Sequence, residues 1–325
     1  MMRITETIRQ RLPFRGEDGS TRRPVIGLGV IILVLLLLYY PVGMLLSYEI
    51  ADDPDFAVPA DQLQPGQSAA VAIAAALLER EVNEVGWVAN DPFFMPSSLL
   101  DNMPAYQQGI VGALARFAFE LADQIGRSRG SSQLDPDLKD ASGLLQYSGE
   151  VWVWDPSVSL TPTATSEAQY NKARKALENY NRRLASGDAI FERRADNLLA
   201  TLDRIALDIG SSSAVIDRQI AEHADDFIDT QADDIFYNVK GQAYGYYLVL
   251  RALREDFATV INERDLETVY AQLLDSMHRI VMLNPIIVSN GEPDGMMPNS
   301  HLAVQGFYLL RARTQLKEIT NILLK

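Results

Sequence analysis

The chain holds no cysteine and only three histidines among its 325 residues. It therefore has no disulfide, no thiol nucleophile and no thiolate metal site. A chain of this length can bury a sizeable core without disulfides. The sequence also lacks a His-Glu-x-x-His zinc motif, a Ser-x-x-Lys motif, a phosphate-binding P-loop and the glycine motif of dinucleotide-binding folds. These absences favour a non-enzymatic protein without a cofactor.

Basic side chains are scarce as well. The chain carries 29 Lys and Arg against 43 Asp and Glu, a net charge of −14. Six of the arginines but only three of the acids lie in residues 1–24, which leaves 23 basic and 40 acidic side chains, a net charge of −17, for the remainder. So acidic a surface is repelled by nucleic acid. We therefore expect no nucleic-acid partner.

One long stretch lacks charge altogether. No charged residue occurs between Arg23 and Glu49, and residues 30–38 are apolar all round a helix. Roughly 25 residues at ~1.5 Å each reach ~37 Å, more than the ~30 Å hydrocarbon core of a membrane. Cleaved signals usually have a shorter apolar region followed by small residues, whereas Tyr48 and Glu49 follow here. Residues 25–48 are thus predicted to be a retained transmembrane anchor, in preference to a cleaved signal or a buried core helix.

The flanking charges predict the orientation of this anchor. Arginines precede it, whereas acids such as Glu49 and Asp52 follow it. The positive-inside rule then places the N-terminus in the cytoplasm of a single-pass inner-membrane protein, with the rest outside, in the periplasm of a Gram-negative bacterium. The expected organisation is a basic cytoplasmic tail over 1–24, the anchor over 25–48, an acidic, proline-containing linker over 49–66 that lifts the domain off the membrane, and a periplasmic helical domain over 67–325.

Apolar residues recur at helical spacing through most of that domain. The fold class is therefore mainly α, an antiparallel helical bundle after an N-terminal transmembrane helix. Gly241 and Gly245, four residues apart, predict close packing between helices. A capping box at Ser166 and Gln169 starts a long helical segment that the serine-rich residues 210–213 interrupt. The other helices are expected over 67–85 and about 104–126, around 216–227, from about 230 to 260, and over 265–283 and 299–324.

The stretch "GEVWVWDPSVSLTPTAT" does not show helical spacing. Alternation near residues 150–156 predicts a short strand or an extended segment laid on the bundle. Trp152 and Trp154 are two residues apart and so point the same way. They form either a partner-binding surface or part of the core.

The histidines are the side chains whose ordinary pKa lies nearest neutral pH. His223 is followed by Asp226 and Asp229, and imidazole with carboxylates can exchange protons or bind a divalent ion. The competing interpretation is a solvated helix end, so no metal site is expected.

A second candidate corner lies at the start of the last helix. His301 and Asn299 follow the loop that contains Asp294. This corner could supply acid-base chemistry or receive an anionic ligand at the helix N-terminus. Structural capping is the alternative. His278 flanks an apolar stripe and is expected at the edge of the core.

Three segments resemble a known group of proteins: "PDFAVPADQLQPGQSAAVAIAAALLEREV", "NDPFFMPSSLLDNMPAYQQGI" and "SNGEPDGMMPNSHLAVQGFYLLRARTQL". With the N-terminal apolar run, they resemble an uncharacterised family of bacterial single-pass membrane proteins over essentially the whole chain. The resemblance implies a bacterial origin and an inner-membrane location. It brings no activity, substrate or catalytic residue.

These features favour a non-catalytic scaffold or assembly factor of the cell envelope. Its expected partners are the membrane, through residues 25–48, and an envelope protein or a second copy of itself. The first alternative is an envelope hydrolase with His223 or His301 and carboxylates as acid and base. The second is a bundle that binds a ligand in its interior.

Overall fold

The computed structural model describes residues 22–125, 134–154, 160–223, 229, 231–291 and 300–325. Most of these residues are helical and none of them lies in a strand, so the predicted mainly α bundle is confirmed. The α-helices are α1 (Arg22–Ser47), α2 (Ala69–Glu79), α3 (Asn102–Glu120), α4 (Pro136–Leu144), α5 (Ser166–Ser186), α6 (Ala195–His223), α7 (Ala232–Asp256), α8 (Ala258–Glu263), α9 (Glu267–Val281) and α10 (His301–Leu323). The shorter 3-10 and π helices are η1 (Ala60–Gln62), η2 (Arg80–Glu84), η3 (Pro96–Leu99) and η4 (Leu121–Ile125).

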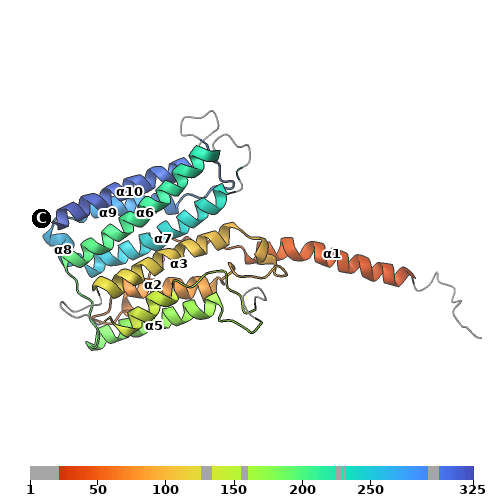
Figure 1. Ribbon diagram of the computed structural model, residues 1–325, viewed down its shortest axis with the longest axis horizontal. Coiled ribbons are helices and arrows are strands. Elements are labelled where there is room, and N and C mark those ends of the chain that lie inside the picture. The colour runs from red at the N-terminus through yellow and green to blue at the C-terminus, as the bar shows by residue number, and fades with distance from the viewer. Residues whose placement is uncertain (1–21, 126–133, 155–159, 224–228, 230, 292–299) are drawn as a thin grey trace, which may run out of the picture.

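Helix α1 projects from the bundle (Figure 1). In the described part of the chain it is the one helix long and apolar enough to cross a membrane. Its residues Gly27–Ser47 have a mean hydropathy of 2.5, and none of this span is buried. A core helix would be covered by its neighbours, so α1 has the length, composition and exposure of a membrane anchor or a signal sequence.

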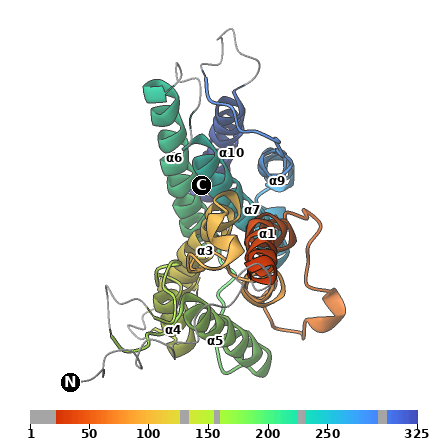
Figure 2. The ribbon, with the colours of Figure 1, turned by 90° about the vertical axis from the view of Figure 1, so that its right-hand side faces the viewer.

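Helices α3 and α7 form the centre of the bundle. On one side α9 packs on α7, and α10 packs on both α9 and α6. On the other side α2 packs on α7 and α5, and α5 packs on α4. A view along α1 shows α6, α9 and α10 on one side of the central pair, with α4 and α5 on the other (Figure 2). The central pair thereby joins the two outer groups into one core.

Glycine lets α3 and α7 approach closely, as the spacing of Gly241 and Gly245 predicts. A Cβ atom on Gly241 would lie 2.0 Å from the carbonyl oxygen of Tyr106 on α3. Gly109 is placed reciprocally, because its Cβ would lie 2.1 Å from the carbonyl oxygen of Asn238 on α7. Side chains cannot occupy such positions, so the two backbones are in direct contact.

Helix α5 starts within one residue of the start predicted from the sequence, but it ends earlier than predicted. The N-cap is Thr165, whose hydroxyl accepts a hydrogen bond from the Ala168 amide at 3.2 Å. The helix ends at Gly187, which has a φ of 79° in the left-handed region that glycine favours. Residues 187–194 then separate α5 from α6, although the sequence predicted one long segment there.

The predicted interruption at residues 210–213 is wrong, because α6 runs through them without a break. The hydroxyls of Ser211 and Ser212 donate to the carbonyls of Leu207 and Asp208, four residues earlier, both at 3.2 Å. Serine weakens a helix chiefly when its hydroxyl competes for the backbone in other conformations. Here the Ser211 hydroxyl is satisfied within the helix, and the Ser212 hydroxyl shares its one hydrogen between Asp208 and the side-chain oxygen of Gln242 on α7.

The segment that joins α1 to the bundle, part of the predicted linker over residues 49–66, contacts the bundle. Residues 49–58, which we name the strap, lie against α3 and α7. The carbonyl oxygens of Ala51 and Asp53 accept hydrogen bonds from the hydroxyls of Tyr106 and Tyr244, at 3.1 and 2.8 Å. The strap is therefore part of the folded domain and does not lift it away from α1.

A buried charge holds the middle of the strap. The side chain of Lys240 is completely buried, and its Nζ atom lies 2.5 Å from Oδ2 of Asp52. Farther along, Arg251 donates to the carbonyls of Pro54 and Phe56. The Arg80 guanidinium lies over the Phe56 ring at 4.5 Å, a cation–π contact. Proline and acids made this stretch look like a linker, whereas its partners lie far away in the sequence.

The segment predicted as a strand or extended chain near 150–156 is described as far as Trp154. No residue from 150 to 154 is in a strand. The amides of Thr163 and Ser166 donate to the carbonyls of Val153 and Val151, at 2.9 and 3.0 Å. This stretch therefore runs alongside residues 163–166, which agrees with the extended alternative.

Candidate functional site

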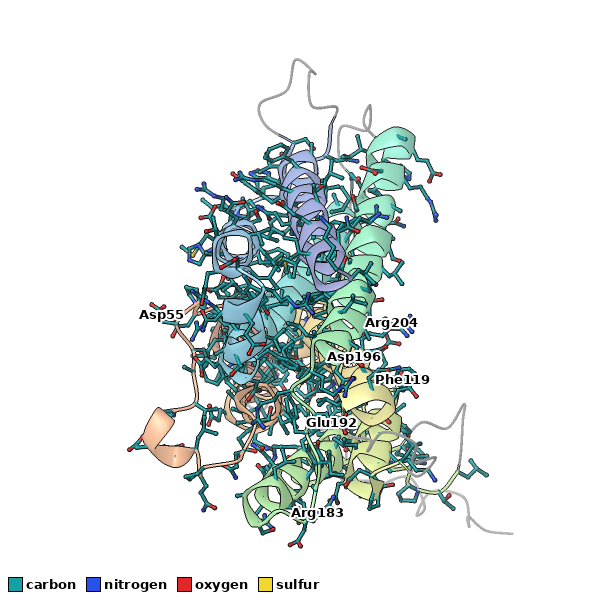
Figure 3. The ribbon with its side chains drawn as sticks, turned by 90° about the vertical axis from the view of Figure 1, so that its left-hand side faces the viewer. Asp55, Phe119, Arg183, Glu192, Asp196 and Arg204 are labelled. Carbon is teal, nitrogen blue, oxygen red and sulfur yellow. The ribbon has the colours of Figure 1, made fainter. Side chains whose placement is uncertain are left out.

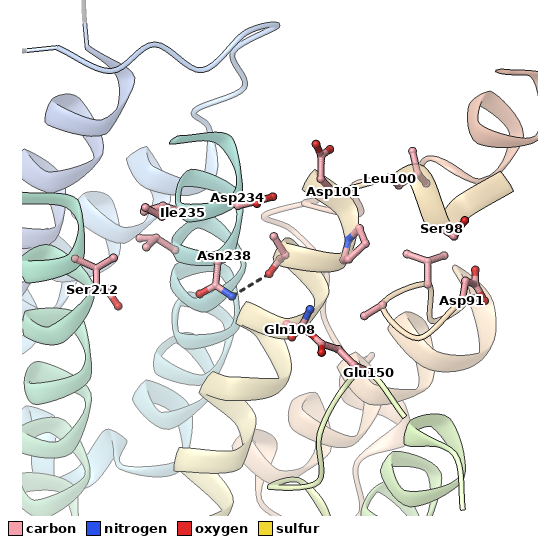
Figure 4. Close-up of a pocket in the computed structure, with 16 residues that line it drawn as sticks. Asp91, Ser98, Leu100, Asp101, Gln108, Glu150, Ser212, Asp234, Ile235 and Asn238 are labelled. Carbon is pink, nitrogen blue, oxygen red and sulfur yellow. Dashed lines mark hydrogen bonds between the residues drawn. The ribbon is translucent and has the colours of Figure 1, made fainter. Parts of the chain in front are cut away.

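A groove of about 510 Å³ lies at the N-terminal ends of α3 and α7, and residues of α6 and of the segment 88–91 also line it (Figure 4). Ser98 of η3 borders it, and η3 itself contacts α1. The amide of Asn238 in the groove wall donates to the carbonyl of Ala105 at 3.2 Å, which joins α7 to α3. The groove has both polar and apolar walls. Its apolar side chains include Val88, Leu100, Val215 and Ile235, and its carboxylates are Asp91, Asp101, Glu150 and Asp234.

The groove carries negative charge that no cation in its walls compensates. No Lys, Arg or His is among the described residues that line it. Burial raises the pKa of Asp91, against a hydrogen bond from Ser97. Burial and the neighbouring carboxylates of Asp233 and Asp101 raise the pKa of Asp234. Such raised values indicate carboxylates that a cation would stabilise.

The way helices start explains why acids gather here. Asp101 caps α3, since its Oδ1 atom accepts a hydrogen bond from the Asn102 amide at 2.8 Å. Asp233 and Asp234 lie in the first turn of α7, where the helix dipole favours negative charge. Because α3 and α7 start at the same end of the bundle, their N-terminal acids meet. Each acid alone suggests only a helix start, so sequence reasoning missed the groove.

Of the first predicted cluster, the structure describes His223 and Asp229, whereas Asp226 lies outside the described residues. The side chain of Asp229 accepts hydrogen bonds from the amides of Gln219 and Asn290, each as short as 2.8 Å. Burial alone would raise the pKa of Asp229, but these hydrogen bonds stabilise the charged carboxylate and hold its pKa below the usual value. No group of three or more metal-ligating side chains occurs in the described part of the chain. Asp229 therefore joins α6 to the segment before α10.

Of the second predicted corner, only His301 is described, because Asp294 and Asn299 lie outside the described residues. The Nδ1 atom of His301 accepts a hydrogen bond from the Ser289 amide at 3.1 Å and lies 2.8 Å from the Ser289 hydroxyl. Burial lowers the pKa of His301. The ring is thus neutral at pH 7 and fastens α10 to the preceding segment.

This arrangement predicts a pH dependence of stability. Because the pKa of His301 is lower in the folded chain, the unfolded chain takes up a proton first as pH falls. The stability contributed by neutral His301 is therefore present above its ordinary pKa of about 6.5 and is lost below it. Urea unfolding of the full chain in detergent should show that the free energy of unfolding falls less between pH 7 and pH 5 in His301→Asn than in the unmodified protein. The amide oxygen of that asparagine can still accept the hydrogen bond from Ser289. Equal losses in the two proteins would contradict this assignment.

The two tryptophans differ in their surroundings. Trp152 is half-buried, and its ring meets that of Phe94 edge to face with 5.6 Å between centroids. Trp154 is 51% exposed, so it is not a core residue. Neither tryptophan is among the residues that line the groove.

The fold and the groove define the class of the molecule: a helical bundle joined to an exposed, apolar N-terminal helix. The chain belongs to the family described as an uncharacterised protein conserved in bacteria (DUF2333), whose model matches residues 26–231 and 221–325. The family resemblance noted in the sequence is thereby confirmed over nearly the whole chain. Searches of curated proteins and of solved structures gave no match.

Proposed function

We propose that the protein is a non-catalytic scaffold of the bacterial cell envelope, anchored in the inner membrane by α1. Its acidic groove would hold a basic segment of an envelope partner protein. The observation that carries this proposal is a groove with polar and apolar walls whose described lining holds four carboxylates and no basic side chain. A segment that presents lysine or arginine beside apolar residues would complement both parts of the wall.

A retained anchor is supported by the contacts that α1 makes. The hydroxyls of Tyr39 and Tyr40 donate to the carbonyls of Phe94 and Phe93 of the bundle, at 3.1 and 2.8 Å. Cleavage after α1 would remove these partners and leave the strap without its preceding helix. The arginines of residues 1–24 support an N-terminus in the cytoplasm and a groove in the periplasm.

Site-directed cross-linking in cells tests the groove. A photo-cross-linking amino acid at Gln108, in the groove wall, should capture an envelope protein through a stretch that contains lysine or arginine. The same amino acid at Leu207, which is 59% exposed on α6 and not in the groove, is the matched control. Capture should then be compared with that in the double variant Asp101→Asn/Asp234→Asn.

The double variant should weaken capture, because two attractive charges are lost. Exposed ion pairs contribute about 0.2–1 kcal/mol each, so we expect roughly fivefold weaker binding, with stronger binding at low salt. The fold should stay intact, since neither carboxylate makes a buried ion pair in the described structure. Undiminished capture, or the same proteins captured from Leu207, would refute the role of the groove.

A further inference from the structure

A loop beside α1 combines exposure with a lack of charge. Residues 92–100, which we name the Phe93 loop, hold no charged side chain and are flanked by Asp91 and Asp101. Phe93 is 83% exposed, Phe94 45% and Leu99 58%. The opposite end of the bundle instead presents charged side chains such as Arg183, Asp196 and Arg204 (Figure 3). Contiguous exposed apolar side chains mark an interaction surface.

The Phe93 loop lies against α1 within the apolar span. Besides the hydrogen bonds from Tyr39 and Tyr40, Pro96 packs on Gly43, where an added Cβ would lie 2.3 Å from the proline Cγ. These contacts fix the level of the loop along α1. The loop meets α1 between residues 39 and 43, inside the span Gly27–Ser47.

The length of α1 then sets the depth of the loop in a membrane. Crossing the ~30 Å hydrocarbon core takes about 20 residues. Counted from Pro24, where the charge-free run begins, the outer boundary of the core falls near Gly43 or beyond it. At ~1.5 Å per residue, Tyr39 and Tyr40 lie roughly 5 Å or more below that boundary. The backbone of Phe93 and Phe94 lies at the same depth, because those tyrosines donate to it.

We propose that the Phe93 loop inserts into the outer leaflet of the bilayer that α1 spans, with Phe93, Phe94 and Leu99 among the acyl chains. This inference rests on the proposed function in one respect, that α1 is a membrane anchor. The tryptophans fit the same arrangement, since Trp152 touches Phe94 and Trp154 is exposed nearby in the chain. Tryptophan is enriched at the level of lipid headgroups.

Insertion of the loop would explain both the hydrogen bonds that the α1 tyrosines make and the position of the groove. A tyrosine hydroxyl inside the hydrocarbon core requires a partner, and the loop carbonyls supply one. A bundle held by α1, the strap and an inserted loop has a fixed tilt on the membrane. Its groove, which includes Ser98 and Leu100 of the loop, then opens at the membrane surface.

The absence of cysteine makes the test direct. Single variants Phe93→Cys, Leu35→Cys and Leu324→Cys of the full chain would carry an environment-sensitive fluorophore in phosphatidylcholine vesicles. Leu35 is 62% exposed in the middle of α1, and Leu324 is 71% exposed beside the C-terminus, at the end of the bundle away from α1 (Figure 1). A nitroxide on the lipid acyl chain quenches only labels in the hydrocarbon core. Iodide quenches only labels that water reaches.

Insertion predicts that the nitroxide lipid quenches the label at Phe93 nearly as much as the label at Leu35, and that iodide quenches only the label at Leu324. If the label at Leu35 is quenched by lipid while that at Phe93 responds to iodide, the loop is in water and the inference fails, although the anchor stands. A label at Phe93 that responds to neither quencher shows a protein partner or second copy on the loop, which also refutes insertion. A label at Leu35 that escapes the lipid quencher overturns the anchor itself.

Discussion

Replacing Asp52 with alanine should lower the free energy of unfolding by about 3–5 kcal/mol, the usual cost of leaving a buried charge without its partner. The Lys240 side chain is 0% exposed and forms an ion pair with the Asp52 carboxylate 2.5 Å away. The alanine variant leaves the ammonium group under the strap with no counter-charge. Urea unfolding of the full chain in detergent, followed by circular dichroism, measures the loss.

A second variant separates the cost of the stranded charge from the loss of strap contacts. In Asp52→Ala/Lys240→Met the ammonium group is removed together with its partner, and methionine keeps much of the apolar volume of the lysine. Replacing a buried ion pair with apolar side chains is often close to neutral, so the double variant should recover most of the lost stability. Asp55→Ala is the matched control, since Asp55 is exposed in the same strap and should change stability by under about 0.5 kcal/mol. A double variant as unstable as Asp52→Ala would show that the strap contacts, not the charge, account for the effect.

The strap also shows where sequence reasoning stops. Acids and prolines over residues 49–66 are typical of a linker, and the local pattern contains nothing to contradict that. The partner that holds Asp52 lies 188 residues away on α7. The groove was missed for the same reason, because Asp91, Asp101 and Asp234 come from three elements that only the packing of α3 on α7 brings together.

Helices were easier to predict than the breaks between them. The apolar stripes of residues 67–85 and 265–283 are repeated over several turns, and they correspond to α2 with η2 and to α9. A break depends on a few residues whose effect varies with context. Serines 211 and 212 continue a helix because their hydroxyls bond within it, whereas Gly187 ends one by adopting a positive φ.

Adding a single methyl group at Gly241 should destabilise the bundle by about 3 kcal/mol or more. The new Cβ atom of Gly241→Ala would lie 2.0 Å from the Tyr106 carbonyl oxygen, so α3 and α7 would have to move apart. Overpacking of a core typically costs about 1–3 kcal/mol, and the cost is at the upper end when the obstacle is backbone that no rotamer change can move. Gly109→Ala meets the Asn238 carbonyl in the same way and should be equally harmful. Unfolding of the full chain in urea measures both losses.

The matched control is Gly112→Ala, one turn farther along α3. Nothing lies within 4 Å of a Cβ atom at Gly112, and that residue is exposed. Alanine is favoured over glycine in a helix by about 0.5–1 kcal/mol, so this variant should be neutral or more stable. A similar loss of stability at Gly112 and Gly241 would mean that glycine serves helix flexibility and not close approach. A loss of stability in Gly241→Ala and Gly109→Ala alone would show that the α3–α7 contact holds the bundle together.

Partner capture from Gln108 should then fall in the same two variants, because separating α3 from α7 also separates the acids of the groove.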